Sequence, residues 1–165
     1  MAKDNYYTPS KFIESARRVM GSIELDPTSC ELANETVKAM RILTIENSMF
    51  RNSIACETMF FNPPYSQPLP FVERVVDGVL SGEIGQVIGV LNTDHSTRWW
   101  REIEKIASSY CFLHDRIQFI DANNGDLTKM TSNNRPQFLF HASANLGGRD
   151  EFRREFSQYG LVLKK

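Results

Sequence analysis

The hydrophobic positions of the chain follow a helical period in five segments. Apolar residues recur at helical spacing from Phe12 to Met20, and Gly21 follows as the expected terminator. Thr8 and Pro9 precede this run, which predicts Thr8 as the N-cap and Pro9 as the first helical residue. Further helices are predicted from about Cys30 to Met40, over the apolar face Phe71, Val72, Val75, Val76, Val79 and Leu80, through Trp99, Ile103 and Ile106, and from Asp150 to Gln158.

Short apolar runs bounded by turn residues lie between these helices and predict strands. The predicted strands are Ile23–Leu25, Thr58–Phe61, Gln86–Leu91, Tyr110–Leu113, Ile117–Ile120 and Gln137–Phe140, and the final helix leads into the apolar run Leu161–Leu163. Strands that alternate with helices indicate an α/β fold with a mostly parallel central sheet flanked by helices. No linker interrupts the pattern, so a single domain over residues 1–165 is expected.

Composition narrows the class of protein only slightly. The 41% of hydrophobic residues suits a folded globular domain, and the net charge of −1 gives no global sign of a nucleic-acid binder. The three cysteines form no CxxC pair, so no metal site is expected and the thiols suit a reducing cytosol. No apolar run is long enough to cross a membrane, so no membrane partner is expected.

Two polar residues stand where predicted strands end. Asp26 and Pro27 follow the first strand, and Asn62 follows the buried strand that ends at Phe61. In an open α/β sheet, ligands bind outside the carboxyl ends of the strands. Asp26 and Asn62 are therefore expected to share one cleft.

The run Asn62-Pro63-Pro64-Tyr65 indicates chemistry on an amino group. The exocyclic amino nitrogen of a base is a poor nucleophile because its lone pair is delocalised into the ring. The side-chain oxygen of Asn62 and the carbonyl of Pro63 can accept both of its hydrogens, since the following proline has no N–H and leaves that turn without a ladder partner. Tyr65 offers a face on which an extruded base can stack. Such a site would hold the nitrogen in line with a sulfonium methyl group.

Each of these features also has a structural reading. Asn62 to Tyr65 can be a proline-rich turn after a buried strand, and Asp26-Pro27 can be a turn that caps a helix. The start of the first helix can hold a carboxylate, such as the methionine end of a cofactor, or be a simple cap. Trp99 and Trp100 can form a stacking platform, although core packing is the commoner use of such a pair.

Several motifs in one order resemble the Dam-like N6-adenine DNA methyltransferases of phages and prophages. They begin with Tyr7-Thr8-Pro9, Leu25-Asp26-Pro27 and Asn62-Pro63-Pro64-Tyr65-Ser66. They continue with Thr97-Arg98-Trp99, Asp115-Arg116-Ile117-Gln118-Phe119 and Tyr159-Gly160-Leu161-Val162-Leu163, so the similarity covers nearly the whole chain.

The resemblance implies a Rossmann-like methyltransferase fold and S-adenosylmethionine as the cofactor. By this resemblance, Tyr7, Thr8 and Pro9 would hold the methionine carboxylate, Asp26 with Pro27 would line the cofactor pocket, and residues 62–65 would form the catalytic motif. The loop after Pro27 lacks the glycines of most methyltransferase cofactor loops. Asp26 and Asn62 are only 36 positions apart in the chain, and Glu46 is the candidate between them for the ribose hydroxyls.

The expected function is transfer of a methyl group from S-adenosylmethionine to the N6 amino group of adenine at specific sites in double-stranded DNA. The resemblance also implies a phage- or prophage-encoded protein in the cytoplasm of a bacterial host. Two alternatives remain at this point: a methyltransferase that acts on RNA, cytosine N4 or a protein glutamine, and a non-catalytic module that binds DNA or the cofactor.

One long segment, residues 121–137, is polar, rich in asparagine and predicted to be irregular. Loops of this length in a compact domain usually have a function. A single domain leaves no room for a separate target-recognition domain, so this loop, with Asn123, Asn124, Asn133, Asn134 and Arg135, is the candidate DNA-reading segment.

Overall fold

A computed structural model describes residues 6–121, 128–132, 134–145 and 147–165 of the chain. The elements, in chain order, are β1 (Tyr6–Tyr7), α1 (Ser10–Met20), β2 (Leu25–Asp26), α2 (Glu31–Val37), β3 (Arg41–Ile42), β4 (Cys56–Phe61), α3 (Leu69–Ser81), β5 (Ile84–Asn92), α4 (Arg98–Ile106), β6 (Ala107–Leu113), β7 (Gln118–Asp121), β8 (Met130–Ser132), β9 (Gln137–Ser143), α5 (Arg149–Phe156) and β10 (Gly160–Lys164).

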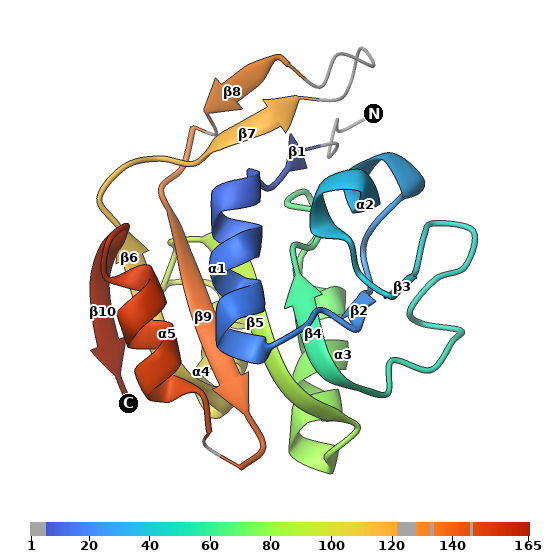
Figure 1. Cartoon of the computed structure of the whole chain (residues 1–165). Helices are drawn as coiled ribbons and strands as arrows, with labels where there is room; N and C mark the ends of the chain where they lie inside the picture. Colours follow the sequence, from blue (N-terminus) through green and yellow to red (C-terminus); the bar gives the residue numbers. More distant parts are fainter. Residues whose placement is uncertain (1–5, 122–127, 133, 146) are drawn as a thin grey trace.

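A seven-stranded sheet forms the centre of the molecule, in the order β10-β6-β9-β5-β4-β2-β3 (Figure 1). Strands β3, β2, β4 and β5 pair in parallel, whereas β9 lies antiparallel between β5 and β6, and β10 lies antiparallel to β6. Strands β2 to β6 therefore all point one way, and β9 and β10 run against them. The expected α/β fold with a mostly parallel sheet is confirmed.

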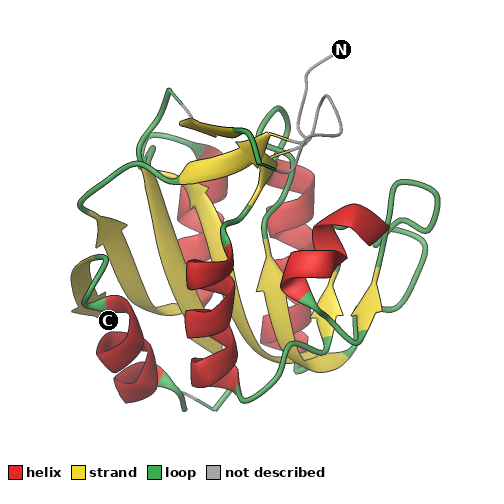
Figure 2. Ribbon diagram, turned by 45° about the horizontal axis from the view of Figure 1, so that its top comes forward, coloured by secondary structure: helices red, strands yellow, loops and turns green. Residues whose placement is uncertain are grey.

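Helices cover both faces of this sheet (Figure 2): α1, α2 and α5 lie on one face, and α3 and α4 on the other. Each strand packs against the helices on both faces, because successive side chains point to opposite faces of the sheet. In β5, Val87 and Leu91 pack under α3 and α4, while Ile88 and Val90 pack under α1 and α5. Each predicted helix thus buries its apolar face against its own side of the sheet.

The start of the first helix differs from the prediction. Pro9, not Thr8, is the N-cap of α1, and no side chain caps that end of the helix. Thr8 lies one residue further out and is buried, with its hydroxyl unused for capping. The expected terminator is confirmed, because Gly21 has a φ of 82° and its N–H bonds to the carbonyl of Arg17.

The second helix is shorter than predicted, ending at Val37 and not near Met40. Lys38 adopts a left-handed φ of 51°, which no α-helix can continue through. The side chain of Asn34 bonds both the N–H and the carbonyl of Ala39 at 2.8 and 3.2 Å, and so takes the place of the next helical turn.

Two further predictions from apolar periodicity need correction. Leu80 was expected on the buried face of α3 but is 63% exposed, since it lies beyond the contact with the sheet. Trp99 and Trp100 are buried against the sheet, so the alternative of a stacking platform at this pair is wrong.

A second, three-stranded sheet of order β1-β7-β8 lies across the end of the molecule toward which β4 points (Figures 1 and 2). It changes the interpretation of residues 121–137, because β8 lies within that segment and pairs antiparallel with β7. Part of the predicted irregular loop is thus one arm of a hairpin. Asn123, Asn124 and Asn133 lie outside the described residues.

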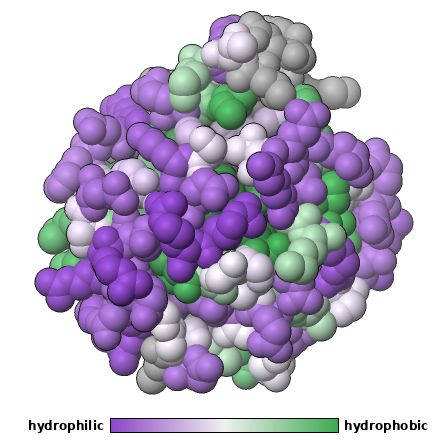
Figure 3. All heavy atoms as spheres, viewed as in Figure 1, coloured by the Kyte–Doolittle hydropathy of each residue, from purple (hydrophilic) through white to green (hydrophobic). Residues whose placement is uncertain are grey.

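The face that carries α1, α2 and α5 is mostly hydrophilic, with hydrophobic side chains visible in small patches between the elements (Figure 3). This pattern fits helices that turn their apolar sides inward. Among the described residues, no helix has the length and apolar character needed to cross a bilayer.

Candidate active site

A cavity of about 400 Å³ opens where β2, β3 and β4 end, beside β1 and the loop that leads into α2. Seven of the residues predicted for the site line it: Tyr7, Thr8, Asp26, Pro27, Glu46, Asn62 and Pro64. Pro9, Pro63 and Tyr65 are not in its lining. The cleft expected at the carboxyl ends of the strands is present, and Asp26 and Asn62 share it.

Asn62 is placed by the end of β4, since the two prolines after it cannot continue a ladder. Its backbone carbonyl accepts a hydrogen bond from the Thr28 hydroxyl at 3.0 Å. Its side-chain nitrogen donates to the carbonyl of Tyr6 at 3.1 Å. A carbonyl can only accept, so this bond determines which end of the amide is the nitrogen. The side-chain oxygen is left buried, with no partner among the described residues.

Thr8 brings a second unsatisfied group to the cavity. Its side chain is 3% exposed, and its hydroxyl has no partner among the described residues. The N-terminus of α1 begins two residues later, where the first N–H groups of a helix have no partners within the helix. The Thr8 hydroxyl and the N-terminus of α1 can together bind an anionic group.

Tyr7 lies beside Cys30, with its hydroxyl 3.2 Å from the sulfur. Burial, and then the hydrogen bond to Cys30, raise the pKa of Tyr7 above its ordinary value, so the phenol is neutral at physiological pH. The Cys30 sulfur also accepts from the N–H of Ala33 and acts as the N-cap of α2. This contact joins β1 to the loop after Asp26.

Asp26 supplies a buried carboxyl group that is 4% exposed. Burial raises its pKa to about 6, although hydrogen bonds from the Thr28 N–H and the Ser29 hydroxyl favour the ionised form. Among the described residues, no cationic side chain contributes to this balance. Asp26 can therefore change its charge near neutral pH, or keep it by pairing with a cationic or hydroxyl-bearing ligand.

Glu46 lies at the exposed rim of the cavity, in the loop that follows β3. Hydrogen bonds from its own N–H and from the Thr44 hydroxyl, the latter at 2.9 Å, lower the pKa of Glu46 and keep it ionised. Neighbouring Ile45 is 94% exposed, and together with Met49 and Phe71 it gives this end of the cavity an apolar wall.

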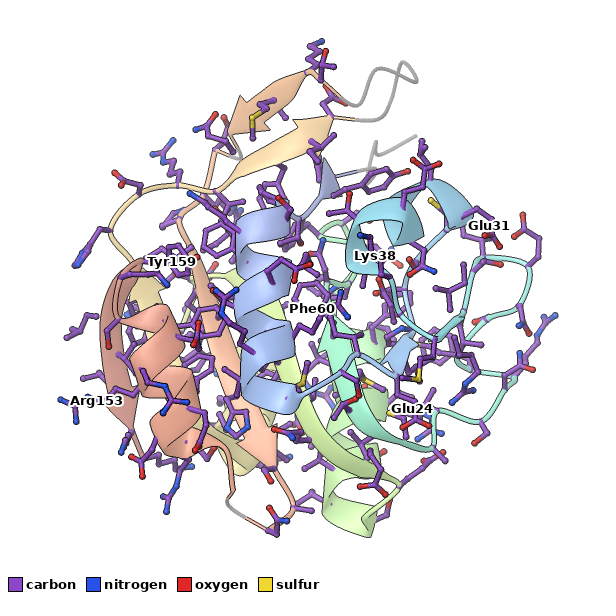
Figure 4. All side chains as sticks on the ribbon, in the orientation of Figure 1. Glu24, Glu31, Lys38, Phe60, Arg153 and Tyr159 are labelled. Carbon is purple, nitrogen blue, oxygen red and sulfur yellow. The ribbon has the colours of Figure 1, made fainter. Side chains whose placement is uncertain are left out.

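The sequence reasoning missed most of that wall. Phe71 appeared only as part of a helix face, and Ile45, Met49 and Phe60 carried no signal of their own. Figure 4 shows Phe60 on β4, in the space between α1 and α2. The loop residues Thr28, Ser29 and Cys30 could have been found, because they follow a strand end at the same edge as Asn62.

Tyr65 packs edge-on against Phe119 of β7, with ring centroids 5.9 Å apart. Tyr65 as a whole residue is partly exposed, whereas its hydroxyl is buried without a partner among the described residues, and burial raises the pKa of Tyr65. Pro63 is buried beside it. The motif thus presents an amide oxygen without a partner in the described part of the chain, one buried proline and a partly exposed tyrosine.

The sheet order, the antiparallel β9 and the cavity at the carboxyl ends of the strands are those of the Rossmann-like methyltransferase fold. A proposed RNA methyltransferase from Pyrococcus horikoshii shares this fold: the TM-score is 0.53 at 14% sequence identity, and the match covers 86% of this chain and 87% of that one. The sequence profile of the DNA N-6-adenine-methyltransferase (Dam) family matches residues 1–152. The chain belongs to this family.

A curated relative supports the assignment. The DNA N-6-adenine-methyltransferase of Haemophilus phage HP1 (strain HP1c1) is 32% identical over 139 residues, which is 83% of this chain and 77% of the relative. The resemblance inferred from the motifs and the expected class of enzyme, a DNA adenine N6 methyltransferase, are thereby confirmed.

Proposed function

We propose that the cavity binds S-adenosylmethionine and that Asn62 presents the N6 amino group of an adenine in double-stranded DNA for methylation. The observation that carries this proposal is the hydrogen bonding of Asn62. Its amide nitrogen is tied to Tyr6, and its oxygen is a buried acceptor without a partner among the described residues. Leaving such an acceptor unpaired costs about 1–3 kcal/mol, which a bound amino group would recover.

The other groups of the cavity match the parts of the cofactor. The Thr8 hydroxyl and the start of α1 suit the methionine carboxylate. Asp26 suits the methionine ammonium group or the ribose, and ionised Glu46 suits the ribose hydroxyls. Ile45, Met49 and Phe71 offer an apolar surface for the purine ring. When bound, S-adenosylmethionine supplies an electrophilic methyl group on its sulfonium.

The protein's part in the reaction is to hold and polarise the amino nitrogen. Asn62 Oδ1 and the carbonyl of Pro63 accept its two hydrogens, which favours a tetrahedral nitrogen with an available lone pair. On gaining the methyl group that bound S-adenosylmethionine would supply from its sulfonium, N6 would release one proton to solvent. Positioning the reactants in this way provides much of the rate enhancement.

An adenine must leave the helix before its amino group can reach this site. The ring of Tyr65, a partly exposed residue, is the proposed stacking surface, and base–aromatic stacking contributes about 1–3 kcal/mol. Phosphate contacts are expected from exposed basic residues of the hairpin region, such as Lys129 and Arg135, which in the protein alone pair with Asp121 and Asp94.

Transfer of labelled methyl groups from S-adenosylmethionine to unmethylated plasmid DNA, followed by nucleoside analysis, tests the proposal. We expect N6-methyladenine from the wild type, and loss of about 10²–10³ in rate from Asn62→Ala with cofactor binding retained. Asn145→Ala, an exposed residue after β9, is the matched control and should stay fully active. An active Asn62→Ala variant would remove the role given to Asn62.

A further inference from the structure

The orientation of Asn62 depends on β1, a strand of only two residues. The Tyr6 carbonyl that accepts from the Asn62 amide belongs to this strand. Its pairing partner is β7, with Tyr6 opposite Asp121 and Tyr7 opposite Ile120. A change in the position of β7 would therefore move the group that orients Asn62.

Phe119 joins the same parts through side chains. It lies in β7 and is fully buried. Its ring centroid is 6.2 Å from that of Tyr6 and 5.9 Å from that of Tyr65, in tilted and edge-on arrangements. One side chain of the hairpin thus contacts the strand that orients Asn62 and the aromatic ring of the catalytic motif. Aromatic contacts of this kind stabilise their partners beyond the burial of apolar area.

The base of the hairpin is held to the main sheet. Buried Gln137 accepts from the N–H of Ile117 at 3.3 Å and donates to the side chain of Asn92 at 3.1 Å. The N–H of Thr93 bonds to the carbonyl of Pro136 at 2.7 Å. Both arms of the hairpin are thereby hydrogen-bonded to the end of β5. Phe119 therefore lies on a strand that is fixed at its base, and not on a free loop.

We propose that Phe119 is a positioning residue, which couples the β7–β8 hairpin to the orientation of Asn62 through Tyr6 and to the ring of Tyr65. This inference rests on the proposed role of Asn62. Without the ring, β1 and Tyr65 lose their common support, and the amino group of the substrate is held less accurately. Asp26 and Glu46 are carried by β2 and by the loop after β3, so cofactor affinity should change much less than the rate.

Phe119→Leu tests this role, and Phe152→Leu is the matched control. Phe152 is also fully buried, in the same hydrophobic cluster, but it packs on Phe156 and His141 of the opposite end. Each variant removes one aromatic ring from the same hydrophobic cluster. Four quantities are compared with the wild type: the urea midpoint, the Kd for S-adenosylmethionine, the single-turnover methylation rate, and the NMR signals of the Asn62 side-chain amide in the protein alone.

We expect both variants to lose similar stability, and only Phe119→Leu to lose about tenfold or more in single-turnover rate and to shift the Asn62 amide signals. Equal rates for the two variants, or unshifted Asn62 signals in Phe119→Leu, would overturn the coupling. If Phe119→Leu does not fold, Phe119→Met offers a similar volume on a longer, flexible side chain that fills irregular gaps better, and is judged by the same measurements. The NMR comparison needs no methyl transfer, so it decides the coupling even if the wild type methylates no DNA.

Discussion

At the scale of single residues, burial gives ordinary polar groups their special properties in this cavity. Asn62, Thr8 and Asp26 are common side chains at the ends of strands and helices. Here two of them have an oxygen without a partner among the described residues, and the third has a pKa raised to about 6 by burial. A bound ligand can supply each group with the hydrogen-bond partner or the opposite charge that it lacks. This is the physical basis for assigning the three groups to ligand binding.

Asp26 makes cofactor binding dependent on pH. Its carboxyl group is ionised above about pH 6, and the ionised form is the one that suits an ammonium group or ribose hydroxyls. Affinity for S-adenosylmethionine should therefore fall as the pH is lowered through 6, by up to about tenfold per pH unit. Calorimetric titration between about pH 5 and 8 measures this. Asp26→Asn should bind more weakly at pH 8 with a flat profile, and an unchanged profile in that variant would contradict the assignment.

At the scale of elements, the short interval between Asp26 and Asn62 has a simple explanation. Only α2 and the two-residue strand β3 lie between β2 and β4, and residues 43–55 form loops without a strand or helix. Glu46 therefore follows directly on the edge strand of the sheet. The glycine-poor loop after Pro27 instead uses the Thr28 hydroxyl, the Ser29 hydroxyl and the Cys30 cap to hold its shape.

The hairpin is the element expected to select the DNA sequence. Exchange of residues 121–137 for the corresponding segment of a related enzyme should change the sequence context of the methylated adenine and leave the methylated atom unchanged. The reason is that base readout requires side chains that reach the groove, whereas the reaction depends on Asn62. Sequencing of methylated genomic DNA checks this, and an unaltered context after the exchange would assign readout elsewhere.

At the scale of the whole molecule, two buried ionisable groups at opposite ends of the sheet have opposing effects on stability. His141 is fully buried between Ser108 and Gln86, and burial lowers its pKa to about 4. Between about pH 6.5 and 4 the unfolded chain binds a proton at His141 that the folded chain does not, so stability falls as the pH falls. Asp26, with its raised pKa, binds a proton in the folded chain over about pH 4–6, so its contribution is lost as the pH rises.

The two contributions, each on the order of 3 kcal/mol, should largely cancel in the wild type. They become visible when one group is removed. Relative to the wild type, Asp26→Asn should lose stability as the pH falls from about 6.5 to 4, and His141→Gln should gain it. Urea unfolding at several pH values measures both, and parallel curves for all three proteins would show that neither group titrates as described.

Apart from the strands β1, β3, β8 and β10, the sequence by itself determined the helices and strands, their alternation, and the strand-end positions of Asp26 and Asn62. It could do so because these depend on local periodicity and on proline at positions where no strand can continue. The same local signals identified Asn62 to Tyr65 and the start of α1 as candidate site segments. Where local rules were weak, the prediction was wrong, as at the Thr8 cap and in the length of α2.

Only the tertiary structure decided which of these groups meet and in what state. The Tyr6 carbonyl that orients Asn62 is 56 positions away, and the apolar wall of Ile45 and Phe71 comes from two separate segments. The support of β1 by Phe119 likewise joins residues far apart in the chain. Hydrogen-bond partners, burial and the pKa values that follow from it depend on three-dimensional neighbours, which no spacing along one sequence specifies.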